Sequence, residues 1–310
     1  MSFSSRTKDE LAEGCRLGNA EEKRSLLCGI THAAGSMTLG RGGIGLQYIT
    51  ENSSVAALTA RLGRELYGVN AEASISEKER LNAVSNVVRF TGNGVKELLS
   101  DAGYGVDGDE DFELGYIPPR LIDDEGRAKA FLKGAFLGAG SVSDPNKGYH
   151  LEIVCRYERF AAALCDIMAG LGISAKFLPR KSSYIVYLKD GELVSDFITL
   201  IGAMNSTMAF EEARVMRSVS NHINRQQNFE DANMNKAAAA AAQQLVDIEF
   251  IRLNAGLDSL PAKLKQVAEL RINNPEATLS DLAEMAEISK SGLNHRLAKL
   301  STIAQELRDK

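Results

Sequence analysis

The chain has 310 residues, 44% of them hydrophobic and 25% charged, a composition typical of a globular protein with two or three domains. No run of about 18 apolar residues occurs, and residues 1–13 lack an apolar core, so neither a membrane span nor a secretory signal is expected. The formal net charge is −5, so the chain as a whole lacks the excess of basic residues that is typical of nucleic-acid-binding proteins. DNA binding therefore has to be argued from local motifs.

The cysteines give no indication of a metal site. They are Cys15, Cys28, Cys155 and Cys165, and no two of them have the close spacing of zinc ligands. Reduced thiols in a cytoplasmic protein are the simpler interpretation. We therefore expect no metal and no small-molecule cofactor.

An internal repeat with an offset of 105 residues organises the first two thirds of the chain. Residues 34–36, Ala-Gly-Ser, recur at 139–141, and Gly29 recurs as Gly134. The offset holds without a gap over about 25 residues. Each copy has an apolar helix, an Ala-Gly-Ser stop, a hairpin turn and an alternating strand, so the sequence predicts a duplicated structural unit.

Hydrophobic periodicity predicts the same order of elements, αββαββα, in both copies. The first copy is expected to have helices at 21–32, 54–67 and 95–102, a turn at 40–43, and strands at 44–50, 71–76 and 84–90. The second is expected to have helices at 127–137, 160–171 and 193–201, a turn at 144–148, and strands at 149–155, 175–179 and 183–188. Antiparallel hairpins leave one sheet face for helices and the other for solvent or a partner.

Residues 26–35 and 131–140 resemble the LAGLIDADG motif of homing endonucleases, and the resemblance covers residues 20–202. It implies that the two motif helices pack side by side, an approach that Gly29, Gly134 and Gly138 would permit. In that family each helix supplies one carboxylate to a divalent metal at a scissile phosphate, and a saddle-shaped sheet lies on DNA.

The positions of the two carboxylates are occupied here by Ala34 and Ala139. Alanine has no oxygen to bind a hard cation and cannot activate water. Asp144 and Glu152 are nearby in sequence, but neither is at a helix end. We therefore expect no catalytic residues and no enzyme activity; an active nuclease with a rebuilt metal site is the alternative.

Two isolated residues each have a structural and a functional interpretation. His32, near the end of the first motif helix, is expected to be a core residue rather than a metal ligand, because no second ligand has suitable spacing. Arg41, on the first hairpin turn, is a candidate phosphate contact, and a solvated turn arginine explains it equally well.

A linker helix is predicted for residues 214–260, where six consecutive alanines at 237–242 favour helix. Its polar residues form a candidate phosphate-contacting face: Asn224, Arg225, Asn228, Asn233 and Lys236. The alternative is a linker helix whose polar side chains are simply solvated.

The last fifty residues have the pattern of a three-helix helix-turn-helix domain. The helices are expected at 261–272, 278–286 and 290 to about 306. Thr278 can cap the second helix, with Asp281 in its first turn. Ala283 is expected where the helices cross, and Ile288 is expected to be buried in the turn.

The exposed face of the last helix carries residues suited to DNA. They are Ser289, Lys290, Ser291, Asn294, His295, Arg296 and Lys299. Asn pairs bidentately with adenine and Arg with guanine, and Ser and Lys hold phosphates at a helix N-terminus. In this motif the N-terminal residues of the second helix meet base edges. A three-helix core with a solvated polar face is the alternative.

Over nearly its whole length the chain resembles the WhiA family, regulators of sporulation and cell division in Gram-positive bacteria. The resemblance includes the degenerate LAGLIDADG-like pair and the stretches 224–236, 257–261 and 288–297. It implies a transcription regulator that binds double-stranded DNA, acts in the cell cycle, cell division or chromosome segregation, and is cytoplasmic and nucleoid-associated. Glu287 occupies a turn position that is often glycine in such motifs, which leaves the turn geometry open.

The expected fold class is α+β, with a duplicated LAGLIDADG-like domain of antiparallel saddle sheets followed by an all-α helix-turn-helix domain. The expected domains are the first repeat at 1–110, the second at 111–213, the linker helix at 214–260 and the helix-turn-helix domain at 261–310. A different function remains open, in which the saddle binds a transcription or cell-division protein instead of DNA and the chain is a protein-interaction scaffold.

Overall fold

The computed structural model describes residues 1–14, 19–40, 43–78, 83–105 and 113–309. Cys15 and Arg41 lie outside the described residues. The chain divides into two compact units, Met1–Arg217 and Ser218–Lys310. Within the described ranges, no helix is both long enough and apolar enough to span a membrane.

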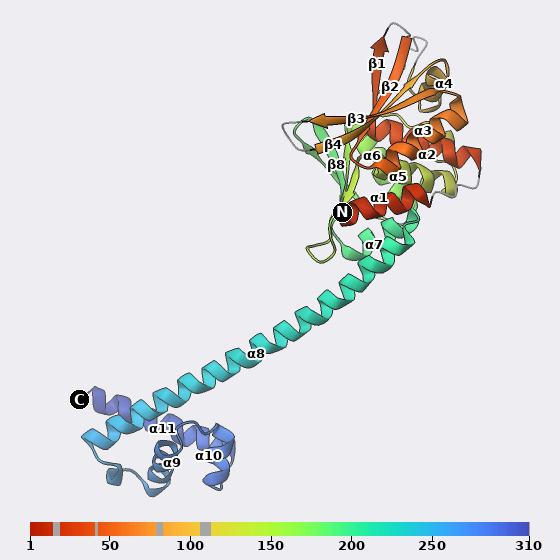
Figure 1. Cartoon of the computed structure of the whole chain (residues 1–310). Coiled ribbons are helices and arrows are strands. Elements are labelled where there is room, and N and C mark those ends of the chain that lie inside the picture. Colours follow the sequence, from red (N-terminus) through yellow and green to blue (C-terminus); the bar gives the residue numbers. More distant parts are fainter. Residues whose placement is uncertain (15–18, 41–42, 79–82, 106–112, 310) are drawn as a thin grey trace. The chain divides into compact units, whose positions relative to one another are not determined.

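The first unit contains the predicted αββαββα arrangement twice (Figure 1). The first copy consists of α2 (Ala20–Ala34), β1 (Gly35–Gly40), β2 (Gly43–Thr50), α3 (Ser53–Tyr67), β3 (Asn70–Lys78), β4 (Ala83–Thr91) and α4 (Gly94–Asp101). The second consists of α5 (Glu125–Ala139), β5 (Gly140–Val142), β6 (Leu151–Cys155), α6 (Glu158–Gly170), β7 (Lys176–Arg180), β8 (Ser183–Leu188) and α7 (Gly191–Leu200). Helix α1 (Phe3–Glu13), which the sequence pattern did not predict, precedes them.

Each copy forms a four-stranded antiparallel sheet, in the orders β1-β2-β4-β3 and β5-β6-β8-β7. The registers are also equivalent, because Gly35 pairs with Tyr48 and Gly140 with Ile153. Tyr48 and Ile153 are buried on the faces that pack against helices. Bounds were predicted for only three strands of each sheet, because β1 and β5 begin directly at the glycine that ends the motif helix and no separating turn marks them.

The motif helices α2 and α5 lie side by side, too close for any side chain at the crossing (Figure 1). A Cβ atom at Gly29 would overlap the carbonyl oxygen of Phe131, and one at Gly134 would overlap that of Leu26. A Cβ atom at Gly138 would lie 3.0 Å from the Cβ of Ala33. The prediction that these glycines permit close approach is confirmed.

His32 belongs to the core beside this crossing, as predicted. Its Nε2 lies 2.7 Å from the carbonyl oxygen of Ala102, to which it donates, and its ring stacks on Tyr104 and Phe160 at centroid distances of 5.1 and 5.2 Å. Burial lowers the pKa of His32 to about 4, against the raising effect of the hydrogen bond to Ala102. The ring is therefore neutral near pH 7.

A single helix, α8 (Met204–Asn254), occupies most of the segment predicted as a linker helix and starts ten residues earlier than expected. Its N-terminus is fixed in the first unit by the carboxylate of Glu10, which accepts hydrogen bonds from the backbone N–H groups of Asn205 and Ser206 at 2.7 and 2.8 Å. The negative charge of Glu10 also interacts favourably with the positive end of the helix dipole. Phe210, one turn further on, is fully buried.

The second unit packs three helices against the end of α8: α9 (Ala262–Asn273), α10 (Leu279–Met285) and α11 (Lys290–Arg308) (Figure 1). Its core contains Leu282, Leu297 and Leu300, and also Ile248 and Ile251 from α8. Both isoleucines are fully buried. The three-helix core expected from the sequence is thus completed by a fourth helix.

A buried ion pair ties α8 to α11. Arg308 Nη2 lies 2.9 Å from Asp247 Oδ1, and the Asp247 side chain is almost fully buried. Burial disfavours its charged form, but hydrogen bonds from Ser301, Arg308 and Gln243 outweigh this and lower the pKa of the carboxyl group. The C-terminal turns of α8 and α11 are therefore held together by charge as well as by apolar packing.

Helices α10 and α11 have the predicted caps at their N-termini. Thr278 Oγ1 accepts from the backbone N–H of Asp281, and Asp281 Oδ2 accepts from that of Thr278, which together form a capping box. Ser289 caps α11. Glu287 has a φ of 54°, the left-handed conformation in which a glycine would be unstrained.

We predict that Gly134→Ala lowers the free energy of unfolding of the first unit by about 2–3 kcal/mol, because the added methyl group meets the backbone of α2. Urea unfolding followed by tyrosine fluorescence measures this, since all eight tyrosines lie before residue 217. Gly170→Ala is the control, because nothing lies within 4 Å of the added atom there. Equal effects of the two changes would contradict the close crossing.

We predict that Glu287→Gly stabilises the second unit by about 0.5–1 kcal/mol, because glycine relieves the positive φ. Glu284→Gly, three residues earlier and within α10, should destabilise the unit by about 1 kcal/mol. Amide hydrogen exchange of buried residues in α11 measures both effects. Destabilisation by Glu287→Gly would show that the side chain itself holds the turn.

Candidate nucleic-acid interface

Helix α11 has one buried side and one polar side. Leu293, Leu297, Leu300 and Ala304 are at most 1% exposed and face the core. At 100° per residue, five of the predicted DNA-contacting residues share a single arc of about half the helix circumference, which starts beside Leu297 and extends across the solvent side. They are Lys290, Ser291, Asn294, His295 and Lys299, and all five are exposed.

The structure separates Arg296 from this arc. Its helical position lies between Lys299 and the buried Leu300, and the residue is half-buried. Asn294, which was expected to share base reading with Arg296, lies inside the arc instead. The centre of the polar face is therefore formed by Ser291, Asn294 and His295.

The N-terminus of α11 is open to an anion. Ser289 Oγ accepts from the backbone N–H of Gly292 at 3.1 Å, and the hydroxyl group keeps its own proton for donation. Unpaired N–H groups and the helix dipole favour a phosphate at this end, and the ammonium group of Lys290 adds charge. This end of the helix thus combines phosphate-binding groups with the amide of Asn294 one turn later.

The predicted phosphate-contacting residues of α8 lie on one half of that helix. They are Asn224, Arg225, Asn228, Asn233 and Lys236, and all are exposed. Arg225 and Lys236 are eleven residues apart, which is three turns, so they lie in line along the helix. Neither takes part in an ion pair with any described residue. Ile223 and Met234 lie on the opposite half.

The ends of the two motif helices carry methyl groups where the endonuclease motif has acids. Ala34 and Ala139 are the last residues of α2 and α5. Asp144 is engaged with Asn146 in the loop after β5, and Glu152 lies 3.3 Å from His150 and 3.7 Å from Arg180. Across the described ranges, no three His, Cys, Asp or Glu side chains lie close enough together to hold a metal ion.

A basic side chain that the sequence reasoning missed lies next to these helix ends. Arg156, which follows β6, donates to the carbonyl oxygen of Gly35 at 2.8 Å and to Ser36 Oγ at 2.9 Å. It therefore joins the second repeat to the residue after the first motif helix, where its charge complements the negative end of the α2 dipole. The only sequence signal was an arginine directly after a predicted strand.

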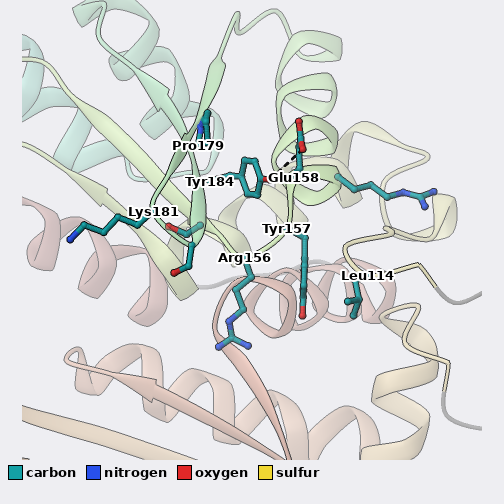
Figure 2. Close-up of a pocket in the computed structure, with 10 residues that line it drawn as sticks. Leu114, Arg156, Tyr157, Glu158, Pro179, Lys181 and Tyr184 are labelled. Carbon is teal, nitrogen blue, oxygen red and sulfur yellow. Dashed lines mark hydrogen bonds between the residues drawn. The ribbon is translucent and has the colours of Figure 1, made fainter.

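Arg156 also lines an open pocket of about 500 Å³ (Figure 2). Lys181 reaches it from the turn between β7 and β8, and Tyr184 Oη donates to Glu158 Oε2 at 3.3 Å. Arg159 also lines the pocket and pairs with Glu113. Three cationic side chains against the single carboxylate of Glu158 give the pocket a positive charge that suits a phosphate.

Acidic and basic side chains balance in one equivalent row of each outward sheet face. One row across the first sheet is Ser36, Gln47, Arg89 and Glu72, and the equivalent row of the second is Ser141, Glu152, Tyr187 and Lys176. The next rows expose apolar side chains: Ile49 (52%), Val154 (38%) and Leu178 (39%). In these described rows cations do not outnumber acids, and Arg180 adds one further cation in β7, whereas nucleic-acid surfaces usually carry a clear excess of cations.

Three family models match the chain. The WhiA N-terminal LAGLIDADG-like domain matches residues 20–104, the WhiA LAGLIDADG-like domain matches residues 128–220, and the WhiA C-terminal HTH domain matches residues 223–304. The third match starts inside α8, in agreement with the contribution of Ile248 and Ile251 of α8 to the core of the second unit.

Curated relatives match the chain from end to end. The probable cell division protein WhiA of Clostridium tetani is 38% identical over 99% of this chain and 98% of its own length. The protein of the same name from Clostridium acetobutylicum is also 38% identical, over 99% of both chains.

A solved structure supports the fold. The crystal structure of full-length DUF199/WhiA from Thermatoga maritima covers 99% of both chains with a TM-score of 0.60, at 24% sequence identity. The duplicated LAGLIDADG-like unit and the helix-turn-helix unit are thus shared in order and in fold. The family models and the curated relatives together establish that the chain belongs to the WhiA family.

Proposed function

We propose that this chain is a sequence-specific, DNA-binding transcriptional regulator that acts in sporulation or in cell division and chromosome segregation. The observation that carries the proposal is the exposed polar arc of α11, on a capped helix within a matched helix-turn-helix domain. Relatives named as cell division proteins support the cellular role. On this proposal the protein is cytoplasmic and associated with the nucleoid.

The chemistry of α11 suits readout in the major groove. The amide of Asn294 matches the donor and acceptor pattern of adenine, and His295 and Ser291 lie beside it on the arc. Lys290 and the helix N-terminus would hold one phosphate and Lys299 another. Arg296 has to extend around the helix to reach a base, so we assign it a flanking contact.

The polar half of α8 is proposed as a second, sequence-independent contact. Its five residues would meet phosphates, and Arg225 and Lys236 provide the charge. We place the helix-turn-helix domain at 261–310 and the linker at 214–260, with the last turns of α8 packed against the former. The repeats at 1–110 and 111–213 form the LAGLIDADG-like part.

We propose that nuclease activity is lost. The support is chemical, since the methyl groups of Ala34 and Ala139 cannot replace carboxylates and the acids nearby in sequence, Asp144 and Glu152, are engaged elsewhere. The guanidinium group of Arg156 beside the first helix end would also repel a divalent cation. On this proposal, the LAGLIDADG-like part has the fold of the endonucleases but lacks the carboxylates that their catalysis requires.

A second candidate function is favoured by the outward sheet faces. The balanced charge of one row on each sheet, together with the exposed Ile49, Val154 and Leu178, resembles the mixed composition of protein interfaces more than a DNA-binding surface. In this scaffold alternative the saddle binds a transcription or cell-division protein while α11 binds DNA. Retention of a single protein by residues 1–217 immobilised on a resin, with no DNA retained, would support it.

The proposed function is tested with full-length protein, genomic fragments and supercoiled plasmid, with and without Mg²⁺. We expect retarded but uncut DNA, with affinity falling about 10²–10³-fold between about 50 and 200 mM salt if four or five phosphates are neutralised. Mg²⁺-dependent nicking would mean that other carboxylates act as catalysts. Absence of retardation at the lower salt concentration would contradict DNA binding by α11 and leave only the protein-binding part of the scaffold alternative.

Base reading is tested by single substitutions on α11. Asn294→Ala should weaken binding to a preferred site by about 1–3 kcal/mol and relax base preference, with little change for random DNA. Lys299→Ala should weaken both alike and lower the salt slope by about one. Gln305→Ala, exposed near the far end of α11, is the control.

The same set of substitutions shows which side of α11 contacts the bases. We expect Arg296→Ala to relax base preference less than Asn294→Ala does, because Arg296 is off the polar arc. The reverse order would mean that the helix enters the groove with its other flank.

A further inference from the structure

The second unit contains a groove that the proposed DNA-binding function leaves unused. It has a volume of about 610 Å³ and is lined mainly by apolar atoms. The alanine run of α8 forms one wall with Ala237, Ala241 and Leu245, and the segment from α9 to α10 forms the other with Ala277 and Leu279. A surface of this size and composition is typical of a site for a small organic molecule.

A buried cation lines this groove. Arg271, on α9, is only 2% exposed. Its Nε donates to Gln244 Oε1 at 3.1 Å and its Nη1 to the carbonyl oxygen of Ala277 at 2.7 Å, both of which are neutral acceptors. No carboxylate of the described residues forms an ion pair with it, and burial lowers its pKa. A buried charge without a counter-ion is costly and is usually paired.

The charges around the groove limit the chemical class of ligand that it can bind. Lys290, the first residue of α11, adds a second cation at the rim. Glu276 also lines the rim, and the carboxylate of Asp281 lies close by in the Thr278 capping box. These acids disfavour a ligand with several negative charges, and the apolar wall disfavours a sugar or a nucleotide. A single carboxylate on an apolar body satisfies both conditions.

We propose that this groove binds a small monocarboxylate with an apolar body, whose carboxylate pairs with Arg271 and whose body lies on the alanine face of α8. The planar guanidinium group forms two parallel hydrogen bonds to a carboxylate where geometry allows. The apolar wall would remove the body of the ligand from water. The ligand would supply the counter-ion that the fold does not.

Such a ligand would contact both helices of the helix-turn-helix motif. Leu279 begins α10, and Lys290 begins α11 within the proposed DNA-contacting set. An anion near Lys290 lowers the positive potential at the end of α11 that would meet phosphate. We therefore expect the ligand to weaken DNA binding, a consequence that rests on the proposed function, whereas ligand binding itself does not.

The test uses full-length protein without DNA and three probes of equal chain length: octanoate, octanol and octylamine. Calorimetric titration should show octanoate binding at least tenfold more tightly than octanol, with no detectable binding of octylamine. Alanine-methyl NMR should place the shifted signals at Ala237 and Ala241. Equal affinities of octanoate and octanol, or no binding of octanoate, would overturn the proposal.

Three variants locate the site. Ala241→Leu fills the groove and should abolish octanoate binding, whereas Ala239→Leu, in the same alanine run but outside the groove, should leave it unchanged. Arg271→Gln should remove the preference of octanoate over octanol. Wild-type affinity in Ala241→Leu would overturn the proposal, as would a concentration-dependent dimer that shields the groove from all three probes.

The effect on DNA is then measured separately by adding octanoate to the retardation assay. Octanoate should weaken retardation of DNA by wild-type protein and leave the Ala241→Leu variant unaffected. If the protein retards no DNA, the proposed function fails while the calorimetric result stands. If DNA is retarded but octanoate does not bind, the ligand site alone fails.

Discussion

The first unit depends on the contact between the backbones of α2 and α5. At Gly29 and Gly134 each helix occupies the space where a side chain of the other would lie. Because the helices end together, Ala34 and Ala139 are brought to the same edge of the unit, and each is followed directly by the first strand of its sheet. The crossing therefore fixes the position of both sheets and of the edge that carries the two acid positions of the motif.

This edge has the geometry of the LAGLIDADG motif but carries different residues at the acid positions. The helix ends and strand starts remain in the arrangement implied by the LAGLIDADG motif, but methyl groups replace the acids. Arg156 now forms hydrogen bonds to Gly35 and Ser36 across the repeat boundary. Where the motif places acids around a cation, this chain has an internal cation that stabilises the junction.

Helix α8 contributes differently at its two ends. Its first turn is capped by Glu10 and buried through Phe210 in the first unit, and its last turns give Ile248 and Ile251 to the second. Between them, exposed polar residues occupy one half of the helix, while the alanine run forms a wall of the groove beside Arg271. A segment that serves as a connection in sequence is thus part of two cores and of two candidate binding surfaces.

The sequence by itself determined the duplication, the motif glycines, the two missing acids and the three helices of the helix-turn-helix. These depend on local periodicity, on caps such as Thr278 and Ser289, and on one fixed offset, all of which are visible in the order of residues. Strand β1, the burial of Ile248, the isolated charge of Arg271 and the half-burial of Arg296 were decided only by the tertiary structure. Each of these depends on which distant segment packs against the residue, and a helical or alternating pattern does not specify that partner.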